Sequence, residues 1–285
     1  MGPRRRNLSG QTTFRSFLFV PGARPERFGK AVVAGADAVC IDLEDAVPPD
    51  QKPQAREAAA GFLAGWGAGA PSVGVRLNAP STLAFSQDLA AIAPALPNAA
   101  FVMVPKTQAG IELENLRTAL GADCPPLWPI IETGRALEAA YEIAAAAGPN
   151  GGVLFGAADF SADVGCTLDW EALAYARGRL AAACAAAGIS LLDVPYLDVK
   201  DEAGLIESTR RAKALGFTGR ACIHPDQVAP VNACFTPTQA EIDRAKRVIA
   251  ALADAKGAAA LLDGKLIEKP VILAAQRILD RAGEG

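Results

Sequence analysis

The sequence has a single histidine, no C-x-x-C motif and no apolar run long enough to span a membrane. Its 285 residues include one histidine, His224, so a single chain cannot assemble a metal site or a proton relay from several histidines. Its six cysteines are scattered without a C-x-x-C pair, which argues against a zinc site or a disulfide framework and favours buried free thiols in the cytoplasm. The longest apolar stretches are interrupted before the roughly 18 residues that span a bilayer, so we expect no membrane segment.

The chain also has no excess of basic over acidic residues. The formal net charge is -3 at pH 7, which argues against nucleic acid as a partner, because phosphate backbones are bound by clustered Lys and Arg. Hydrophobic residues make up 51% of the chain, which is enough for a sizeable core. We therefore expect one large domain rather than two.

Short runs rich in Val, Ile, Leu and Phe alternate with segments of helical character. Eight runs have the composition of buried parallel strands: Arg15–Val20, Ala38–Ile41, Val73–Leu77, Ala100–Val104, Trp128–Ile131, Gly152–Phe155, Ile189–Val194 and Ala221–Ile223. The helical segments between them are Glu26–Ala34, Gln54–Ala64, Ser81–Ile92, Gln108–Leu120, Arg135–Ala146, Trp170–Ala187 and Asp201–Leu215. This alternation predicts an α/β fold, a (β/α)8 TIM barrel over residues 15–235, with an open doubly wound sheet as the alternative.

Residues 236–285 exceed what a barrel needs. Thr236-Pro237-Thr238 is typical of a helix start, and it precedes an expected helix over Gln239–Ala255. A glycine-bearing loop and a second helix over Pro270–Ala282 follow. We expect a C-terminal helical extension that could pack on a neighbouring subunit.

Three of the apolar runs end on carboxylates. The second run leads into Asp42, Glu44 and Asp45, the fifth into Glu132 and the sixth towards Asp159. Because active sites of parallel α/β barrels lie at the C-terminal ends of the strands, these acids should converge on one rim. A like-charged pair at 4 Å costs about 4 kcal/mol at an effective dielectric near 20, and a divalent cation removes that conflict. Oxygen ligands favour Mg²⁺, with Mn²⁺ as an alternative, over zinc or copper.

Other reactive residues follow the remaining strands. Arg76 lies near the end of the third run and suits bidentate binding of a substrate carboxylate, and Lys106 follows the fourth. The small residues Gly156-Ala157-Ala158 let main-chain N–H groups approach an anion closely. Each feature has a structural alternative. The acids after the second run could cap the next helix or pair with Lys52, Arg56 and the rim arginines, and the small residues could form a tight turn. His224 is a candidate acid/base group that could instead make a structural hydrogen bond at a helix start.

Seven short motifs occur in a fixed order along the chain. They are Ser16-Phe17-Leu18-Phe19-Val20-Pro21-Gly22, Asp42-Leu43-Glu44-Asp45-Ala46-Val47, Val75-Arg76-Leu77-Asn78, Val104-Pro105-Lys106, Ile131-Glu132-Thr133, Gly156-Ala157-Ala158-Asp159 and Ile223-His224-Pro225-Asp226-Gln227. Together they resemble the citrate lyase β-subunit-like enzymes of the HpcH/HpaI aldolase superfamily, which also contains malyl-CoA and citramalyl-CoA lyases. The resemblance covers nearly the whole chain.

The resemblance implies a TIM barrel with a C-terminal extension, assembled as a homotrimer or a dimer of trimers. It implies Mg²⁺ held by Glu132 and Asp159, with Asp42, Glu44 and Asp45 orienting water on the ion.

The resemblance also implies a reaction. Arg76 would grip a 2-oxo acid product, and the backbone of Gly156, Ala157 and Ala158 would touch its carboxylate. The chemistry is the reversible cleavage of a 3-hydroxyacyl thioester into an acetyl thioester and a 2-oxo acid. The charge that develops on the thioester carbonyl and on the alkoxide is stabilised by a cation and by fixed donors.

One residue departs from the family pattern. Coenzyme A lyases of this family carry an Asp near the C-terminus, which a neighbouring subunit contributes as an acid/base or water-positioning group. Here Glu268 stands at that place. The extra methylene shifts the carboxylate by about 1 Å, and a misplacement of that size can lower a rate about 10²-fold. We expect Glu268 to be functional.

The leading hypothesis is a Mg²⁺-dependent carbon–carbon lyase acting on a short 3-hydroxyacyl-CoA such as malyl-CoA, citramalyl-CoA or citryl-CoA. The alternatives are a citryl-ACP lyase subunit that acts on an acyl-carrier-protein thioester within a citrate lyase complex, and a non-catalytic barrel that binds a metal and an oxo acid. A class II pyruvate aldolase is a further alternative, but those enzymes rely on histidine for base work. Arg24, Arg27 and Lys30 could contact the phosphates of coenzyme A or form a solvated helix face.

Overall fold

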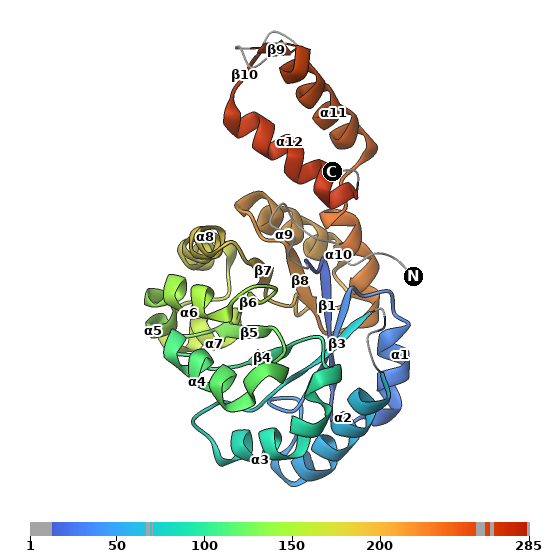
Figure 1. The fold of residues 1–285 in the computed structure, drawn as a ribbon, viewed down its shortest axis with the longest axis vertical. Helices are drawn as coiled ribbons and strands as arrows, with labels where there is room; N and C mark the ends of the chain where they lie inside the picture. The colour runs from blue at the N-terminus through green and yellow to red at the C-terminus, as the bar shows by residue number, and fades with distance from the viewer. Residues whose placement is uncertain (1–12, 67–68, 70, 255–259, 263–264, 284–285) are drawn as a thin grey trace.

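The computed structural model describes residues 13–66, 69, 71–254, 260–262 and 265–283. Its centre is a closed barrel of eight parallel strands, in which β1 pairs with both β2 and β8 (Figure 1). The closed barrel is confirmed and the open-sheet alternative is wrong. The strands are β1 (Ser16–Pro21), β2 (Ala38–Asp42), β3 (Ser72–Arg76), β4 (Val102–Val104), β5 (Leu127–Ile131), β6 (Gly152–Phe155), β7 (Ser190–Asp193) and β8 (Gly219–Cys222).

Helices follow the strands and form the outer layer of the barrel. They are α1 (Phe28–Val32), α2 (Lys52–Trp66), α3 (Leu83–Ile92), α4 (Gly110–Leu120), α5 (Gly134–Glu138), α6 (Ala140–Ala147), α7 (Ala157–Val164), α8 (Trp170–Ala187), α9 (Glu202–Leu215) and α10 (Val228–Phe235). Short 3-10 turns lie at η1 (Pro25–Arg27), η2 (Pro49–Gln51), η3 (Ala93–Asn98), η4 (Gly121–Asp123) and η5 (Pro225–Gln227). The helix expected over Arg135–Ala146 is interrupted at Ala139, and α7 and α10 were not expected.

Polar caps and glycines set the ends of several helices. Thr82, Thr133 and Asp201 accept backbone N–H groups in the first turns of α3, α5 and α9. Gly188 and Gly216 follow α8 and α9 with φ of +69° and +106°, a left-handed conformation that costs glycine little. These caps and glycines end the helices, so the connecting loops lie at the two ends of the barrel.

The interior of the barrel is filled at its N-terminal end by aromatic rings. Phe14, Phe17, Phe101 and Trp128 contact one another with centroid distances such as 4.7 Å for the Phe17–Phe101 pair. Gly74 faces this cluster, and a Cβ there would lie 2.5 Å from the Phe101 ring. We call these four aromatic residues the aromatic plug; they close the barrel at its N-terminal end.

Apolar side chains on the outer face of the strands pack against the helices. Val39 and Ile41 of β2 contribute to this layer, as do Ala59 and Leu63 of α2, and all four are almost inaccessible. Burying one such Val, Leu or Ile side chain stabilises the fold by about 1.5–3 kcal/mol. The same layer contains Cys184 and Cys222. All six cysteines are free thiols, as expected, but only Cys40, Cys184 and Cys222 are buried.

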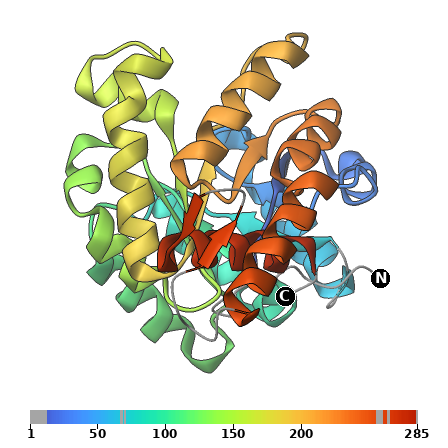
Figure 2. The same ribbon diagram turned by 90° about the horizontal axis from the view of Figure 1, so that it is seen from above.

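The C-terminal residues form an arm that extends from the barrel (Figures 1 and 2). It consists of α11 (Gln239–Asp254), β9 (Ala260–Leu262), β10 (Lys265–Ile267) and α12 (Lys269–Ala282). An antiparallel β9–β10 pair occupies the place where the sequence predicted only a loop. The arm has a small core of its own, formed by Ala245, Val248, Ile267 and Ala275. None of the described helices is long and apolar enough to cross a bilayer.

The arm begins at the N-terminal end of the barrel. Arg15 Nη1, just before β1, donates to Thr236 Oγ1 at 2.8 Å. Thr238 and Glu241 form a capping box at the start of α11, in which each donates a backbone N–H to the other's side chain. The arm therefore leaves the barrel at the end opposite the C-terminal rim.

Candidate active site

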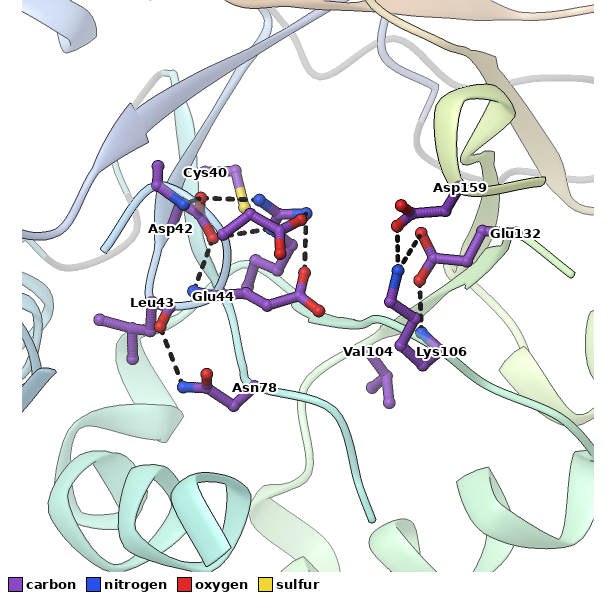
Figure 3. A network of polar contacts seen from close by, with 12 residues as sticks. Cys40, Asp42, Leu43, Glu44, Asn78, Val104, Lys106, Glu132 and Asp159 are labelled. Atoms are coloured by element: carbon purple, nitrogen blue, oxygen red, sulfur yellow. Dashed lines mark hydrogen bonds and ion pairs between the residues drawn. The ribbon is translucent and has the colours of Figure 1, made fainter. Parts of the chain in front are cut away.

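Two clusters of charged side chains face each other on the C-terminal rim of the barrel (Figure 3). The first contains Arg76 at the end of β3 and the acids that follow β2. The second contains Lys106 after β4, Glu132 after β5 and Asp159 in the first turns of α7. All of them lie at the ends of strands, as the sequence predicted, because the parallel order carries every such loop to one rim.

In the first cluster Arg76 makes a bidentate ion pair with Asp42. Arg76 Nε and Nη2 lie 2.7 Å from Asp42 Oδ1 and Oδ2, and Asp42 is 1% exposed. Asp42 also accepts the backbone N–H groups of Glu44 and Ala46. Arg76 Nη1 lies 2.8 Å from Glu44 Oε2 and 3.4 Å from Asp45 Oδ2. The guanidinium is thus held in one orientation by three acids, of which only Asp45 is largely exposed.

A buried network fixes the loop that carries these acids. Lys52 Nζ donates to the carbonyl oxygens of Leu43 and Glu44 at 2.8 and 2.9 Å, and to Asn78 Oδ1 at 2.6 Å. Asn78 in turn donates to Leu43 O and to Asp88, which is fully buried. The sequence suggested Lys52 only as an ion-pair partner of the acids after β2, and it gave no role to Asp88, because the observed contacts join α2, α3 and the loop after β2.

In the second cluster Lys106 lies between two carboxylates. Its Nζ contacts Asp159 directly and lies 3.5 Å from Glu132 Oε2. Its backbone N–H donates to Glu132 Oε1 at 2.6 Å. Lys106 has φ of +53°, which is uncommon for a residue with a side chain and often marks a functional site. The sequence placed Lys106 on the rim but gave no signal for this bridging position.

Gly156 provides the space in which Glu132 sits. A Cβ at Gly156 would lie 2.7 Å from Glu132 Oε2 and 2.6 Å from Glu132 Cβ. Any larger residue would displace the carboxylate.

Gly156 is also the N-cap of α7, so the segment Gly156-Ala157-Ala158 opens a helix rather than forming only a turn. The first backbone N–H groups of a helix have no acceptor within the helix, and they favour an anion. This segment can therefore contact a carboxylate beside Asp159.

Burial changes the pKa values of the acidic side chains on the rim. Burial raises the pKa of Glu44 to about 8, although Arg76 opposes the shift. Burial likewise raises the pKa of Glu132 to about 7, with Lys106 opposing it. For Asp159, burial acts upward, but hydrogen bonds from Lys106 and Glu132 lower its pKa. Negative charge on Glu44 and Glu132 is therefore costly unless a cation lies nearby.

The donor set fits a hard divalent cation. Glu132 and Asp159 present carboxylate oxygens to one point, and an ammonium group already lies between them. Among the described residues no donor hydrogen-bonds to the buried Glu44 Oε2, whose contact with Arg76 is an ion pair only. No group of three His, Cys, Asp or Glu side chains converges within the described part of the chain. Two carboxylates completed by water and substrate are typical of Mg²⁺.

Two residues that the sequence singled out lie away from this centre. Glu268 directly precedes α12, whose first turn lies at the end of the arm remote from the barrel (Figure 1), and its side chain is exposed. His224 Nδ1 accepts the backbone N–H of Asp226 at 3.3 Å and caps η5, which is the structural alternative considered for it. One chain by itself therefore does not bring Glu268 to its own rim.

Comparison with known proteins places this geometry in a family. The model of the HpcH/HpaI aldolase/citrate lyase family matches residues 15–225. The chain belongs to this family. A second model, a carbon–carbon bond lyase of the TIM-barrel fold, matches residues 170–283 and so includes the arm. The protein is therefore an enzyme, a carbon–carbon lyase of the citrate lyase β-subunit-like type.

Relatives within the HpcH/HpaI family cover the chain almost completely. A citrate lyase subunit beta-like protein of Mycobacterium tuberculosis is 36% identical over 94% of this chain and 95% of its own length. A (3S)-malyl-CoA thioesterase of Cereibacter sphaeroides is 35% identical, with 94% of both chains covered. Among solved structures, protein CitE of M. tuberculosis in complex with magnesium, acetoacetate and coenzyme A aligns with a TM-score of 0.79 at 33% identity, over 95% of this chain and 98% of that one.

Proposed function

We propose that this enzyme is a Mg²⁺-dependent lyase that cleaves or forms a short 3-hydroxyacyl-CoA, of the malyl-CoA, citramalyl-CoA or citryl-CoA type. The products of cleavage are an acetyl thioester and a 2-oxo acid. The observation that carries the proposal is the pairing of two clusters across one rim: a fixed guanidinium on one side and a pair of carboxylates that fits a hard cation on the other (Figure 3).

Cleavage moves electrons in a defined way. The 3-hydroxyl group loses its proton, its oxygen becomes the ketone of the 2-oxo acid, and the bond between C2 and C3 breaks. The electron pair passes to the thioester, whose enolate then takes up a proton at C2. Negative charge therefore passes from one oxygen to another, and groups that favour this charge lower the barrier.

Arg76 is suited to bind the oxygen atoms of the oxo acid. Its orientation is set by Asp42 and Glu44, so little reorganisation is needed when charge develops on the substrate. The N–H groups of the first turn of α7 would bind the carboxylate of the same product, with Gly156 leaving the backbone open. These contacts fix the hydroxyl carbon beside the carboxylate pair.

Glu132 and Asp159 are the residues that would hold Mg²⁺, and bound Mg²⁺ would supply Lewis-acid stabilisation of substrate oxygen. The M. tuberculosis CitE structure with magnesium supports this choice of ion, and Mn²⁺ is the expected substitute. Glu44 and Asp45 would orient water in the space between the clusters, whereas Asp42, which is buried and bound to Arg76, would act by holding the guanidinium in place. Lys106 must move its Nζ from between the two carboxylates when a cation binds there.

Glu268 completes this proposal only if subunits associate. Its position at the end of the arm is compatible with reaching the rim of a neighbouring subunit in a homotrimer or dimer of trimers, where it would act as an acid/base or water-positioning group. Mixing Glu268→Ala chains with Glu132→Ala chains tests this. Shared sites restore part of the activity in the mixed oligomer, whereas sites within one chain restore none.

The test of the function is an assay of the purified protein with Mg²⁺ against malyl-CoA, citramalyl-CoA and citryl-CoA, with detection of the acetyl-CoA and oxo acid formed. Glu132→Ala is the matched variant, and it should lose both turnover and Mg²⁺ binding. Absence of cleavage with every thioester, together with normal Mg²⁺ binding by Glu132→Ala, would contradict the proposal. Replacing CoA by acyl-carrier protein in the same assay tests the citryl-ACP alternative.

Thioester hydrolysis is a second candidate, because a malyl-CoA thioesterase is 35% identical over nearly the whole chain. The two reactions give different products from malyl-CoA: a lyase gives acetyl-CoA and glyoxylate, whereas a thioesterase gives malate and free CoA. Measuring glyoxylate and free thiol in one reaction separates them.

A further inference from the structure

A crevice of about 490 Å³ lies outside the barrel wall, between α8, α9 and the loop that follows β7 (the helices are labelled in Figure 1). Its volume is within the range of pockets that bind small organic molecules. Leu173 and Val194 contribute apolar surface, and Trp170 and Tyr196 contribute aromatic surface. Its lining also includes three arginines that the proposed reaction does not use, of which two, Arg177 and Arg220, are buried.

These two arginines share one carboxylate. Arg177 Nε lies 3.1 Å from Asp193 Oδ1, and Arg220 Nη2 contacts Asp193 Oδ2 directly and donates to Ser208 Oγ at 2.9 Å. All three charged side chains are buried: Arg177 is 4% exposed, Arg220 1% and Asp193 0%. Two cations and one anion leave a net positive charge in the wall of the crevice. We call this group the Arg177–Asp193–Arg220 cluster.

Two hydrogen-bond donors of the cluster have no acceptor among the described residues. Within the described chain, Arg177 Nη1 and Arg220 Nε are buried and have no hydrogen-bond acceptor. Burial lowers the pKa of Arg220, with Asp193 opposing this shift and Arg177 adding to it. A buried positive charge in excess of its counter-charge is unfavourable, so the cluster favours an added anion.

The surroundings limit the kind of anion. Asp169, Asp198 and Glu207 also line the crevice from exposed positions and would repel a multiply charged ligand. Arg211, at the same edge, is already paired with Glu171 at 3.1 Å. A single carboxylate on an apolar body suits both the buried excess charge and the apolar walls, whereas a phosphate group does not.

We propose that this crevice binds a small organic monocarboxylate, with the carboxylate on Arg177 and Arg220 and the apolar part against Leu173 and Val194. The crevice reaches the start of α7, because Ala157 and Ala158 also line it. Asp193 and Arg220, however, lie on the outer face of β7 and β8, where they meet α8, and not among the side chains of the barrel interior. The proposal does not depend on the identity of the thioester substrate.

Benzoate is a suitable probe, with benzamide as the uncharged molecule of the same shape and inorganic phosphate as the anion without an apolar body. Titration of the full chain is followed by calorimetry and by tryptophan fluorescence, since the Trp170 ring lies 4.5 Å from the Arg177 guanidinium carbon. Benzoate should bind saturably and change the fluorescence, and the fluorescence change should be absent in Trp170→Phe. Benzamide and phosphate should give neither signal.

Arg177→Met is the decisive variant, because it leaves a neutral Asp193–Arg220 pair and should fold. It should weaken benzoate binding at least about tenfold, the loss expected for a charged hydrogen bond. Arg220→Met makes the same prediction and replaces Arg177→Met if that variant does not fold. Arg210→Met, an exposed residue of α9, is the matched control and should bind benzoate normally.

Three results would overturn the proposal. They are equal binding of benzamide and benzoate, unchanged benzoate affinity in both folded arginine variants, and loss of binding in Arg76→Met alone, which would place benzoate on the catalytic rim. Lyase activity plays no part in these readouts, so a failure here is distinct from a failure of the proposed reaction.

Discussion

Glu132 accepts the backbone N–H of Lys106 at 2.6 Å, while the side chain of the same lysine lies between Glu132 and Asp159. Lys106 adopts φ of +53° in making both contacts. One residue thus orients a carboxylate through its main chain and balances its charge through its side chain. In the free enzyme the ammonium group occupies the space in which we expect Mg²⁺.

Replacing Lys106 by Met should therefore strengthen Mg²⁺ binding and lower the stability of the protein in the absence of Mg²⁺. The ammonium no longer competes for the two carboxylates, so we expect the Kd for Mg²⁺ to fall by about tenfold or more. Without Mg²⁺, two carboxylates lose their cation, and the free energy of unfolding should fall by about 1–3 kcal/mol. Calorimetry with Mg²⁺ and urea denaturation in chelator measure the two effects.

The matched control for Lys106→Met is Lys30→Met, at an exposed position of α1. It should change neither Mg²⁺ affinity nor stability appreciably. Weaker Mg²⁺ binding in Lys106→Met would mean that the lysine supports the metal site instead of competing with the ion.

Gly156→Ala should displace Glu132. The new Cβ would lie 2.7 Å from Glu132 Oε2, too close for either atom, so we expect a loss of about 1–3 kcal/mol in stability and a clear loss of Mg²⁺ affinity. Gly178→Ala in α8 is the matched control, because a Cβ there meets nothing within 4 Å. It should stabilise the protein by about 0.5–1 kcal/mol, since glycine is unfavourable inside a helix. Unchanged Mg²⁺ binding in Gly156→Ala would contradict the proposed role of Glu132.

Arg76→Lys should abolish most activity even though the charge is kept. A lysine cannot reproduce the bidentate pair with Asp42, so we expect kcat/KM to fall by about 10²-fold or more. Arg15→Lys is the matched control, because Arg15 makes a similar bidentate pair with Asp37 at the opposite end of the barrel. It should lose stability, as Arg76→Lys does, but retain kcat/KM. Equal activity losses in both variants would indicate a general structural effect.

Stability without divalent cations should decrease as pH rises. Burial raises the pKa of Glu44 from the ordinary 4.5 to about 8, so between these values the folded state binds more protons than the unfolded state. The free energy of unfolding then falls with increasing pH, by at most about 1.4 kcal/mol per pH unit for this group. Urea denaturation in chelator from pH 5 to pH 9 tests this, and Glu44→Gln should flatten the slope. A slope that is the same in Glu44→Gln would assign the effect to other groups.

The barrel could be predicted from the sequence because each strand is a short apolar run followed by a polar residue, and the alternation with helices repeats. The interruption at Ala139 could not, since the alanine-rich segment around it has uniform helix propensity. Likewise the sequence did not predict α7, because the small residues Gly156-Ala157-Ala158 are equally compatible with a turn.

For the site, strand order predicted which residues share the rim, because parallel strands carry their C-terminal loops to one end. Strand order could not predict which side chains on the rim contact one another. Lys106 bridges Glu132 and Asp159 through tertiary contacts over 26 and 53 residues of sequence, and Lys52 reaches Asn78 over 26. Spacing along the chain carries no signal for such contacts.

Among the described residues, the aromatic plug closes the N-terminal end of the barrel and leaves the C-terminal rim open to ligands. No ligand can pass between Phe17, Phe101 and Trp128, so substrates and products must use the C-terminal rim in both directions. If the oxo acid lies against Arg76 and the start of α7, with the thioester above it, the oxo acid enters first and leaves last. The reaction should then follow an ordered kinetic mechanism, in which the oxo acid is a competitive inhibitor against the acyl-CoA substrate and acetyl-CoA is not. Product-inhibition patterns in the cleavage direction measure this order directly.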